Sequence, residues 1–255
     1  MRLTMPPRTA LVACLALAAA PALAPAQTVP TVQQAEQQKE KPKLFTGDLG
    51  YVKTSGNTDL STLNINEKLA FAKAGWGFEQ TFGTIYGTDE GDVTTSLWRA
   101  GVKGERFLNA KLSAVLGVAW DKNRFAGIDG RFEEFLGLKY RWVESQTNRF
   151  YTELAASLVQ QDNVDGTSDD FPAGRVGAGY RRTFSEKAYF EDTFDWIPNL
   201  EDSDDYRINN EAAIVAPLTS FVALKFSYII RFDNLPALGF EKTDTFFPSG
   251  IQVPF

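Results

Sequence analysis

The sequence predicts an all-β protein: a transmembrane up-and-down antiparallel β-barrel of about 12 strands. Three observations predict this fold class. An export signal begins the chain, apolar residues alternate with polar or small ones over long segments, and the connections between those segments are of two alternating kinds.

Residues 1–26 have the order of a secretory signal peptide. Arg2 and Arg8 precede an apolar run over residues 10–20, and small residues follow it before the expected cleavage point. No stretch of the chain reaches the roughly 18 uninterrupted apolar residues of a transmembrane helix, which argues against a helical membrane protein. An alternative reads residues 11–14 as a lipoprotein cleavage box, although most of the apolar core would then follow the box.

Residues 27–43 are polar and low in complexity, so we expect a flexible periplasmic lead-in, followed by a single barrel domain over residues 44–255. The only cysteine is Cys14, so the mature chain would contain none, and histidine is absent. The formal net charge of −6 argues against a nucleic-acid partner.

The alternation is clearest in residues 221–233, where Phe226 and Tyr228 share one face while Lys225 and Arg231 share the other. Segments 111–121 and 131–143 are nearly as clear. With nine weaker segments, the pattern predicts twelve strands, at residues 45–54, 60–72, 76–88, 93–107, 111–121, 131–143, 149–161, 171–184, 188–198, 206–216, 221–233 and 243–255.

Three acids interrupt the pattern, because Glu67, Glu134 and Asp192 fall on the otherwise apolar face of their segments. A charge at mid-depth on the lipid side of a barrel is costly. Either the predicted register is wrong in those strands or the acids lie near a membrane interface.

The connections alternate along the chain. One set is short, at residues 73–75, 108–110, 144–148, 185–187 and 217–220, and the interleaved set is generally longer and more acidic, at 55–59, 88–92, 126–130, 162–170, 199–205 and 234–242. Short periplasmic turns and longer extracellular loops alternate in this way in outer-membrane barrels. An even strand count also lets the last strand pair with the first, which removes the exposed sheet edges.

Aromatic residues gather near the ends of the segments, as the girdles of a membrane barrel do: Trp76, Tyr86, Trp120, Tyr140, Trp142, Phe150, Phe184, Trp196 and Phe232. An alternative takes them as core aromatics of a water-soluble β-protein.

The chain ends at Phe255 on an alternating segment, which is similar to the signal that barrels present to the outer-membrane assembly machinery. Pro248 and Pro254 should occupy weakly paired positions, because proline has no N–H for the ladder.

Two short motifs carry a family resemblance. Residues 50–59, GYVKTSGNTD, and residues 239–245, GFEKTDT, resemble the opening and closing signatures of the salt-induced outer-membrane protein family, number 481 among the domains of unknown function. The resemblance spans about residues 45–255 and implies a Gram-negative outer-membrane barrel. It implies little about activity. Gly56 and Asn57 are also ordinary turn residues.

The residue types argue against an enzyme. Barrel lipases, deacylases and proteases use a histidine as general base, and the mature chain would offer neither a histidine nor a nucleophilic cysteine. We predict no catalytic residue, cofactor or metal site. Acids in two loops lack the spacing of a known calcium loop, and a solvated acidic rim is favoured over cation binding: Asp162, Asp165, Asp169, Asp170, Glu201, Asp202, Asp204 and Asp205.

If the apolar face meets lipid, the opposite face lines a lumen. The predicted lumen residues comprise nine cations and seven anions: Arg99, Lys103, Glu105, Asp121, Glu133, Lys139, Arg141, Glu153, Arg175, Arg181, Glu191, Asp195, Arg207, Glu211, Lys225 and Arg231. They should form ion pairs, because an unpaired charge in a narrow space loses much of its hydration.

Two functions follow from how these charges pair. Segregated basic and acidic walls would let small polar solutes or ions pass. A network closed across the lumen would make an occluded structural or adhesive barrel that acts through its acidic loops. The sequence favours the narrow channel, and the resemblance links it to salt or osmotic stress. A soluble periplasmic β-protein is the third alternative. The expected partners are outer-membrane lipid, lipopolysaccharide, the assembly machinery and small solutes.

Overall fold

A computed structural model describes residues 44–53, 60–185 and 188–254. The structure described is that of the unit spanning residues 40–255. The predicted signal peptide and lead-in, and Phe255, lie outside the described residues. The described strands are β1 (Leu44–Lys53), β2 (Leu60–Lys73), β3 (Trp76–Asp89), β4 (Asp92–Phe107), β5 (Leu112–Asn123), β6 (Ile128–Glu144), β7 (Asn148–Asn163), β8 (Ser168–Thr183), β9 (Tyr189–Pro198), β10 (Tyr206–Pro217), β11 (Ala223–Asp233), β12 (Thr243–Phe246) and β13 (Ser249–Pro254).

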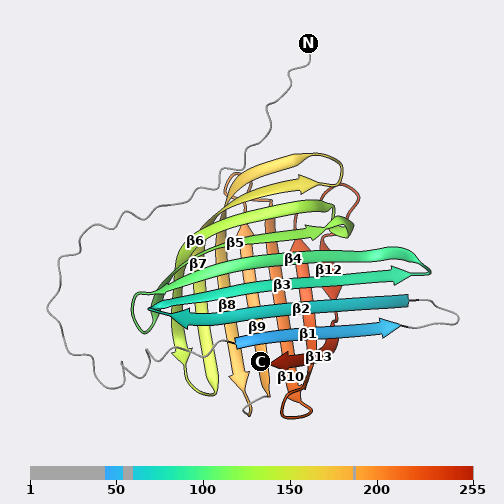
Figure 1. Cartoon of the computed structure of the whole chain (residues 1–255). Helices are drawn as coiled ribbons and strands as arrows, with labels where there is room; N and C mark the ends of the chain where they lie inside the picture. The colour runs from blue at the N-terminus through green and yellow to red at the C-terminus, as the bar shows by residue number, and fades with distance from the viewer. Residues whose placement is uncertain (1–43, 54–59, 186–187, 255) are drawn as a thin grey trace. The chain divides into compact units, whose positions relative to one another are not determined.

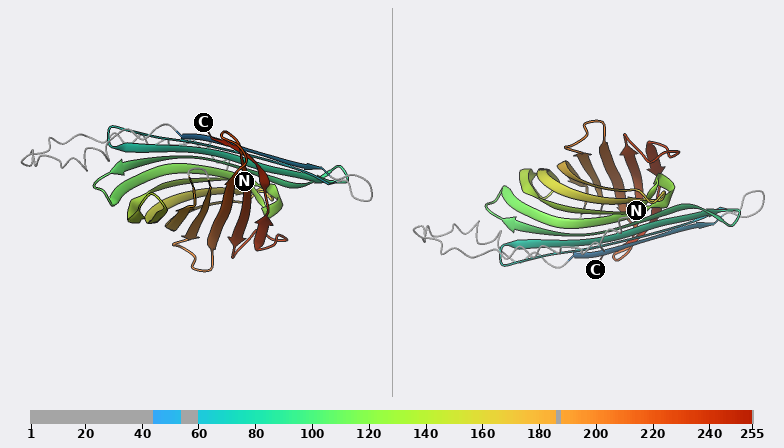
Figure 2. Two further views of the ribbon diagram at one scale, coloured as in Figure 1. Left: turned by 90° about the horizontal axis from the view of Figure 1, so that it is seen from below. Right: turned by 90° about the horizontal axis from the view of Figure 1, so that it is seen from above.

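The strands form one closed antiparallel sheet. Each strand from β1 to β11 pairs with the next in the chain, β13 pairs with β11, and β13 also pairs with β1 to close the ring. Figure 1 shows this closure, with β1 in blue beside β13 in dark red. The two views of Figure 2 show the sheet curling from β1–β4 through β5–β7 to β8–β11.

β12 and β13 are one strand with an interruption. Both pair with β11 in a single register, with Phe246 opposite Ile229 and Ser249 opposite Phe226. Pro248 stands in the gap because it has no N–H to donate, although its carbonyl accepts the backbone N–H of Ser227 at 2.9 Å. Counted with β12 and β13 as one strand, the barrel has twelve strands, which confirms the predicted strand count and fold class.

Burial is inverted relative to a water-soluble protein. Arg207 and Glu133 point inward and are only 4% and 6% exposed, whereas Leu154 and Leu136 point outward and are 67% and 62% exposed. A sheet that hides its charges and presents leucines to its surroundings is stable where those surroundings are lipid. The outer surface also carries exposed aromatic rings near the strand ends, including Trp120, Trp142, Phe184 and Trp196.

The three acids share the outward-facing positions of their strands, so the predicted register is right, although Glu67 also borders the interior of the barrel. Asn210 donates its side-chain amide to Asp192 at 2.8 Å, and Gln80 donates to Glu67 at 2.8 Å. Each of these two acids thus has an amide partner on a neighbouring strand, which reduces the cost of an outward carboxylate. No such partner is found for Glu134 among the described residues.

The connections alternate between the two ends of the barrel, but their lengths differ less than predicted. The turn end carries residues 74–75, 108–111, 145–147, 184–188 and 218–222, and the loop end carries 54–59, 90–91, 124–127, 164–167, 199–205 and 234–242. The β3–β4 connection is only two residues, Glu90 and Gly91, both with positive φ. The prediction of long loops is wrong there and at 162–170, because the strands continue further toward the loop end.

Among the described residues, no helix is long and apolar enough to cross a membrane. A 3-10 turn at Arg124–Ala126 joins β5 to β6, and Gly127, which follows it, lies next to Ala237 and Phe240 of the last connection.

Candidate functional site

The interior of the barrel contains a cavity of about 620 Å³ lined by inward-pointing side chains. This volume lies in the range of small-molecule sites. Its lining extends from Tyr189 and Val222, next to the turn end, to Pro236 and Lys242 in the last connection of the loop end. We refer to it as the central cavity.

The structure brings together most of the charges that the alternation assigns to the inner face. Thirteen of the sixteen line the central cavity: Arg99, Lys103, Asp121, Glu133, Glu153, Arg175, Arg181, Glu191, Asp195, Arg207, Glu211, Lys225 and Arg231. The other three, Glu105, Lys139 and Arg141, do not line it; they cluster near the turn end, and Lys139 connects them to Glu153 in the lining. Lys139 lies 3.4 Å from Glu105, Arg141 also pairs with Glu105, and Arg141 donates to Ser113 at 2.8 Å.

Further charged residues outside the predicted set line the cavity: Asp48, Glu67, Lys68, Glu79, Arg131, Asp233, Glu241, Lys242 and Asp244. Arg131 is two residues from Glu133 in β6, and Asp233 is two residues from Arg231 in β11, so each faces the same side as its predicted neighbour. The alternation that predicts Glu133 and Arg231 as lumen residues therefore also predicts these two. Asp48, Lys68 and Glu79 lie in strands with weaker alternation, where that signal is less clear.

Most of the cations have a carboxylate partner. Glu153 accepts from Lys103 at 3.0 Å and lies 3.4 Å from Lys139, so it bridges β4 and β6. Arg175 contacts Glu133 at 3.3 Å and Asp195 at 3.0 Å. Shorter links of the same kind join Lys225 to Asp48 at 2.7 Å and Lys68 to Glu79 at 2.9 Å.

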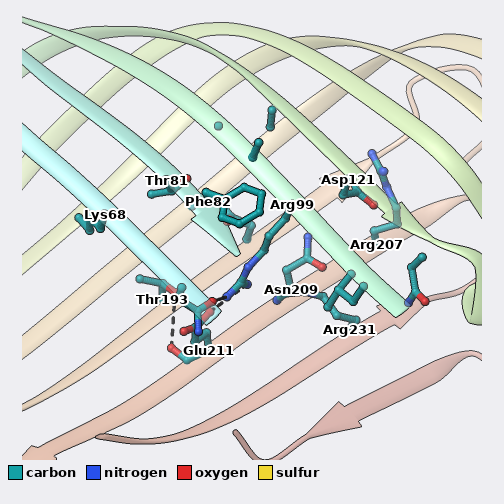
Figure 3. A pocket seen from close by; sticks show the side chains of 18 of the residues that line it. Lys68, Thr81, Phe82, Arg99, Asp121, Thr193, Arg207, Asn209, Glu211 and Arg231 are labelled. Atoms are coloured by element: carbon teal, nitrogen blue, oxygen red, sulfur yellow. Dashed lines mark hydrogen bonds and ion pairs between the residues drawn. The ribbon is translucent and has the colours of Figure 1, made fainter. Parts of the chain in front are cut away.

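Two ion pairs cross the lumen. Arg99 of β4 lies 3.1 Å from Glu211 of β10, and these two strands are six strand positions apart in the closed sheet. Figure 3 shows the two side chains meeting in the cavity. Arg131 of β6 lies 3.8 Å from Asp233 of β11. The charges therefore do not separate into a basic and an acidic wall. They cross the lumen and leave the central cavity between and beside the crossings.

The last connection narrows the loop end. Residues 234–242 approach the β5–β6 connection so closely that a Cβ atom on Gly127 would lie 2.6 Å from Cβ of Ala237 and 2.9 Å from the ring of Phe240. Asn123 of β5 donates to Asp244 of β12 at 3.0 Å. Because β5 and β12 lie on different sides of the ring, this connection extends across the mouth of the cavity.

Comparison with protein families identifies the chain. Its residues 47–255 match the profile described as "Protein of unknown function, DUF481". The chain belongs to the DUF481 family. The match covers the barrel from Gly47 in β1 onward and includes the closing motif at 239–245. This motif lies at the narrowed mouth and contributes Glu241, Lys242 and Asp244 to the cavity lining.

Solved barrels show a distant likeness to this DUF481 chain. The NanC porin is 12% identical with a TM-score of 0.48, covering 82% of this chain and 98% of its own. The translocator domain of the autotransporter NalP from Neisseria meningitidis is 14% identical with a TM-score of 0.45, covering 87% and 91%. An anion-selective porin from Comamonas acidovorans is 12% identical with a TM-score of 0.35, covering 85% and 98%. The barrel assignment depends on the strand pairing of this chain and not on these likenesses. A comparison with curated proteins finds no match.

The acidic loops of the DUF481 barrel use their carboxylates to hold turns. Asp165 accepts the hydroxyl of Thr167 at 2.6 Å and its backbone N–H at 2.9 Å, and these donors hold the pKa of the Asp165 carboxyl below its ordinary 3.8. Asp205 accepts the amide of Asn199 at 2.8 Å. No group of three or more metal-ligating side chains able to hold an ion occurs in the part of the chain that the structure describes.

Proposed function

We propose that this DUF481 barrel is an outer-membrane channel for ions or small polar solutes, narrowed by ion pairs that cross its lumen. The observation that carries the proposal is the central cavity, whose polar lining extends from residues beside the turn end to residues of the loop end. Charged and polar lining groups replace part of a solute's hydration, and a narrow path between them allows selective passage.

The location of the barrel belongs to the same proposal. The outward leucines and aromatics suit a bilayer, and the export signal predicted at residues 1–26 suits the outer membrane of a Gram-negative cell. In this orientation the turn end lies in the periplasm and the loop end outside. The link to salt or osmotic stress remains part of the proposal: a narrow channel would exchange small solutes when external salt changes.

An occluded structural barrel is the second candidate, and two contacts favour it. Arg99 and Glu211 meet across the lumen, and residues 234–242 cross the mouth. Both contacts reduce the open section of the barrel. A barrel closed in this way would act on the envelope through its outer loops and would carry no solute.

Single-channel recording separates the two candidates. We expect the full protein, extracted from outer membranes and shifted in gel mobility by heating, to give small discrete conductance steps in a planar bilayer. Arg99→Ala should raise the conductance and change the ion selectivity, because it removes a crossing cation. The matched control is Arg149→Ala, since Arg149 is exposed at the turn end, pairs with Glu144 at 3.3 Å and does not line the cavity. A heat-modifiable barrel that never conducts would overturn the channel proposal.

A further inference from the structure

One cation of the lumen differs from its neighbours because it is buried without a partner. Arg207 is 4% exposed and lines the central cavity, and its Nη2 atom has no hydrogen-bond partner. No hydrogen bond or ion pair joins its guanidinium group to any of the described residues. Burying a cationic donor without a partner is costly, whereas Arg175 beside it in the lumen has two carboxylates.

A second arginine presents a free nitrogen beside it. Arg131 donates its Nε to Gln161 at 2.8 Å, but its Nη2 atom is buried without a hydrogen bond and lies 3.8 Å from Asp233. Asp233 is the Cα partner of Arg207 across the β10–β11 ladder, and both side chains point inward. Asp233 is thus an ion-pair neighbour of Arg131 and the ladder neighbour of Arg207, and all three side chains line the same cavity.

A third arginine lies two residues away from this aspartate. Arg231 points inward on β11, and among the described residues its guanidinium group makes one hydrogen bond, at 3.4 Å to the adjacent carbonyl of Ile230. Figure 3 shows Arg207, Asn209 and Arg231 together in the cavity. Arg231 lies opposite Asn209 in the β10–β11 ladder, two positions from the pair formed by Arg207 and Asp233. The carboxylates closest to Arg131, on Asp121 and Asp233, stay at 4.0 and 3.8 Å, beyond hydrogen-bonding distance.

From this geometry we infer an oxyanion-binding site in the lumen, formed by Arg131 and Arg207 with Arg231 beside them. The ligand class is a small solute with a carboxylate or phosphate group, because the planar guanidinium fork matches the paired oxygens of these groups. The Nη2 atoms of Arg131 and Arg207, which make no hydrogen bond, are the donors that would hold these oxygens. Asp121 and Asp233 offset two of the three positive charges, so the anion is held loosely enough to leave. The claim that this site makes the channel selective for anions rests on the proposed function. The claim that the site binds an anion does not.

Equilibrium binding tests the site without any need for conduction. The full protein in detergent micelles is titrated with inorganic phosphate and, separately, with acetate, at low salt in a calorimeter. We expect saturable binding of at least one probe, and Arg207→Gln should weaken it about tenfold or more, the usual loss with one charged hydrogen-bond donor. Arg231→Gln provides a second variant should Arg207→Gln fail to give the heat-dependent gel shift of a folded barrel.

The matched control is Arg181→Gln, which removes one cation from the same cavity but takes it from an existing pair with Glu191 at 3.4 Å. We expect it to bind the probe as the unchanged protein does. An equal loss in Arg181→Gln and Arg207→Gln would mean a diffuse potential and no site, and would overturn the inference, as would the absence of saturable binding.

Conduction then separates this inference from the proposed function. In a salt gradient, we expect a reversal potential that favours anions, and a block by millimolar phosphate that Arg207→Gln relieves. Saturable binding by a barrel that never conducts would support the binding site and overturn the channel proposal. Conduction by a barrel that phosphate neither blocks nor binds to would support the channel proposal and overturn the binding site.

Discussion

Glu153 is the carboxylate on which two lysines of the lumen depend. It contacts Lys103 at 3.0 Å and Lys139 at 3.4 Å, and the amino group of Lys139 also lies 3.9 Å from the centre of the Tyr151 ring. Glu153→Gln keeps the shape but removes the charge, which leaves Lys103 without an ion partner in the described structure. We expect the free energy of unfolding to fall by about 1–3 kcal/mol, below the full cost of breaking a deeply buried pair because the lumen is polar. Urea unfolding in lipid vesicles measures this change.

The comparison variant for that experiment is Glu144→Gln. Glu144 pairs with Arg149 at 3.3 Å, but both side chains are about half exposed at the turn end. An exposed pair of this kind contributes about 0–1 kcal/mol. Equal effects of the two substitutions would show that Glu153 gains nothing from its place inside the barrel.

At the residue scale, the sequence predicted which side of the sheet a charge faces more reliably than which partner it finds. Period two placed Arg99 and Glu211 on the inner face, because successive side chains of a strand point to opposite sides. Their meeting across the lumen depends on how far the ring curls and how the strands tilt, and no local pattern encodes this. The unpaired state of Arg207 could not be predicted either. Asp233 is its direct neighbour in the ladder, so the local pattern predicts an ion pair between them.

At the element scale, the connection between β11 and β12 has a stronger effect on the lumen than its length suggests. We expect that shortening residues 235–240 to a tight turn raises single-channel conductance, because Ala237 and Phe240 would no longer press against Gly127 at the mouth. Planar-bilayer recording measures the change. Shortening residues 200–204, which do not line the central cavity, is the control and should leave the conductance as it was. Equal conductance in all three proteins would show that residues 234–242 do not narrow the path.

The strands themselves were predicted well, and their ends less so. Eleven predicted segments correspond to β1–β11 with shifts of a few residues, because backbone pairing continues for a short way past the last alternating side chain. The twelfth segment is broken at Phe247 and Pro248. The weak pairing expected for Pro248 is confirmed, since it lies between strands, whereas Pro254 still ends β13 opposite Thr46. A proline marks where a ladder weakens, but the neighbouring strands decide whether it breaks.

At the scale of the whole molecule, the closure of the ring depends on a short seam. Among the described residues, β1 and β13 share four Cα pairs, from Thr46 opposite Pro254 to Leu49 opposite Ile251, whereas β7 and β8 share fifteen. Closure nevertheless pairs the two strands that would otherwise be edges, as a hydrocarbon environment demands. The even strand number found in the sequence already predicted this seam, and the interrupted twelfth strand explains why it is short.

The inverted burial makes a final prediction that separates a membrane barrel from a soluble β-protein. Leu154 points outward from β7 between Leu138 and Val176, its cross-strand neighbours, and is 67% exposed. On a water-facing surface, Leu154→Arg would change stability by about 0.5 kcal/mol or less. On a lipid-facing surface near mid-depth it costs about 2–4 kcal/mol, because the guanidinium group must enter hydrocarbon. Unfolding in lipid vesicles measures the difference.

Leu200→Arg is the matched control, since Leu200 is 65% exposed in the 199–205 connection at the loop end, where the same substitution should be nearly neutral. Neutral outcomes at both positions would contradict the membrane-spanning assignment.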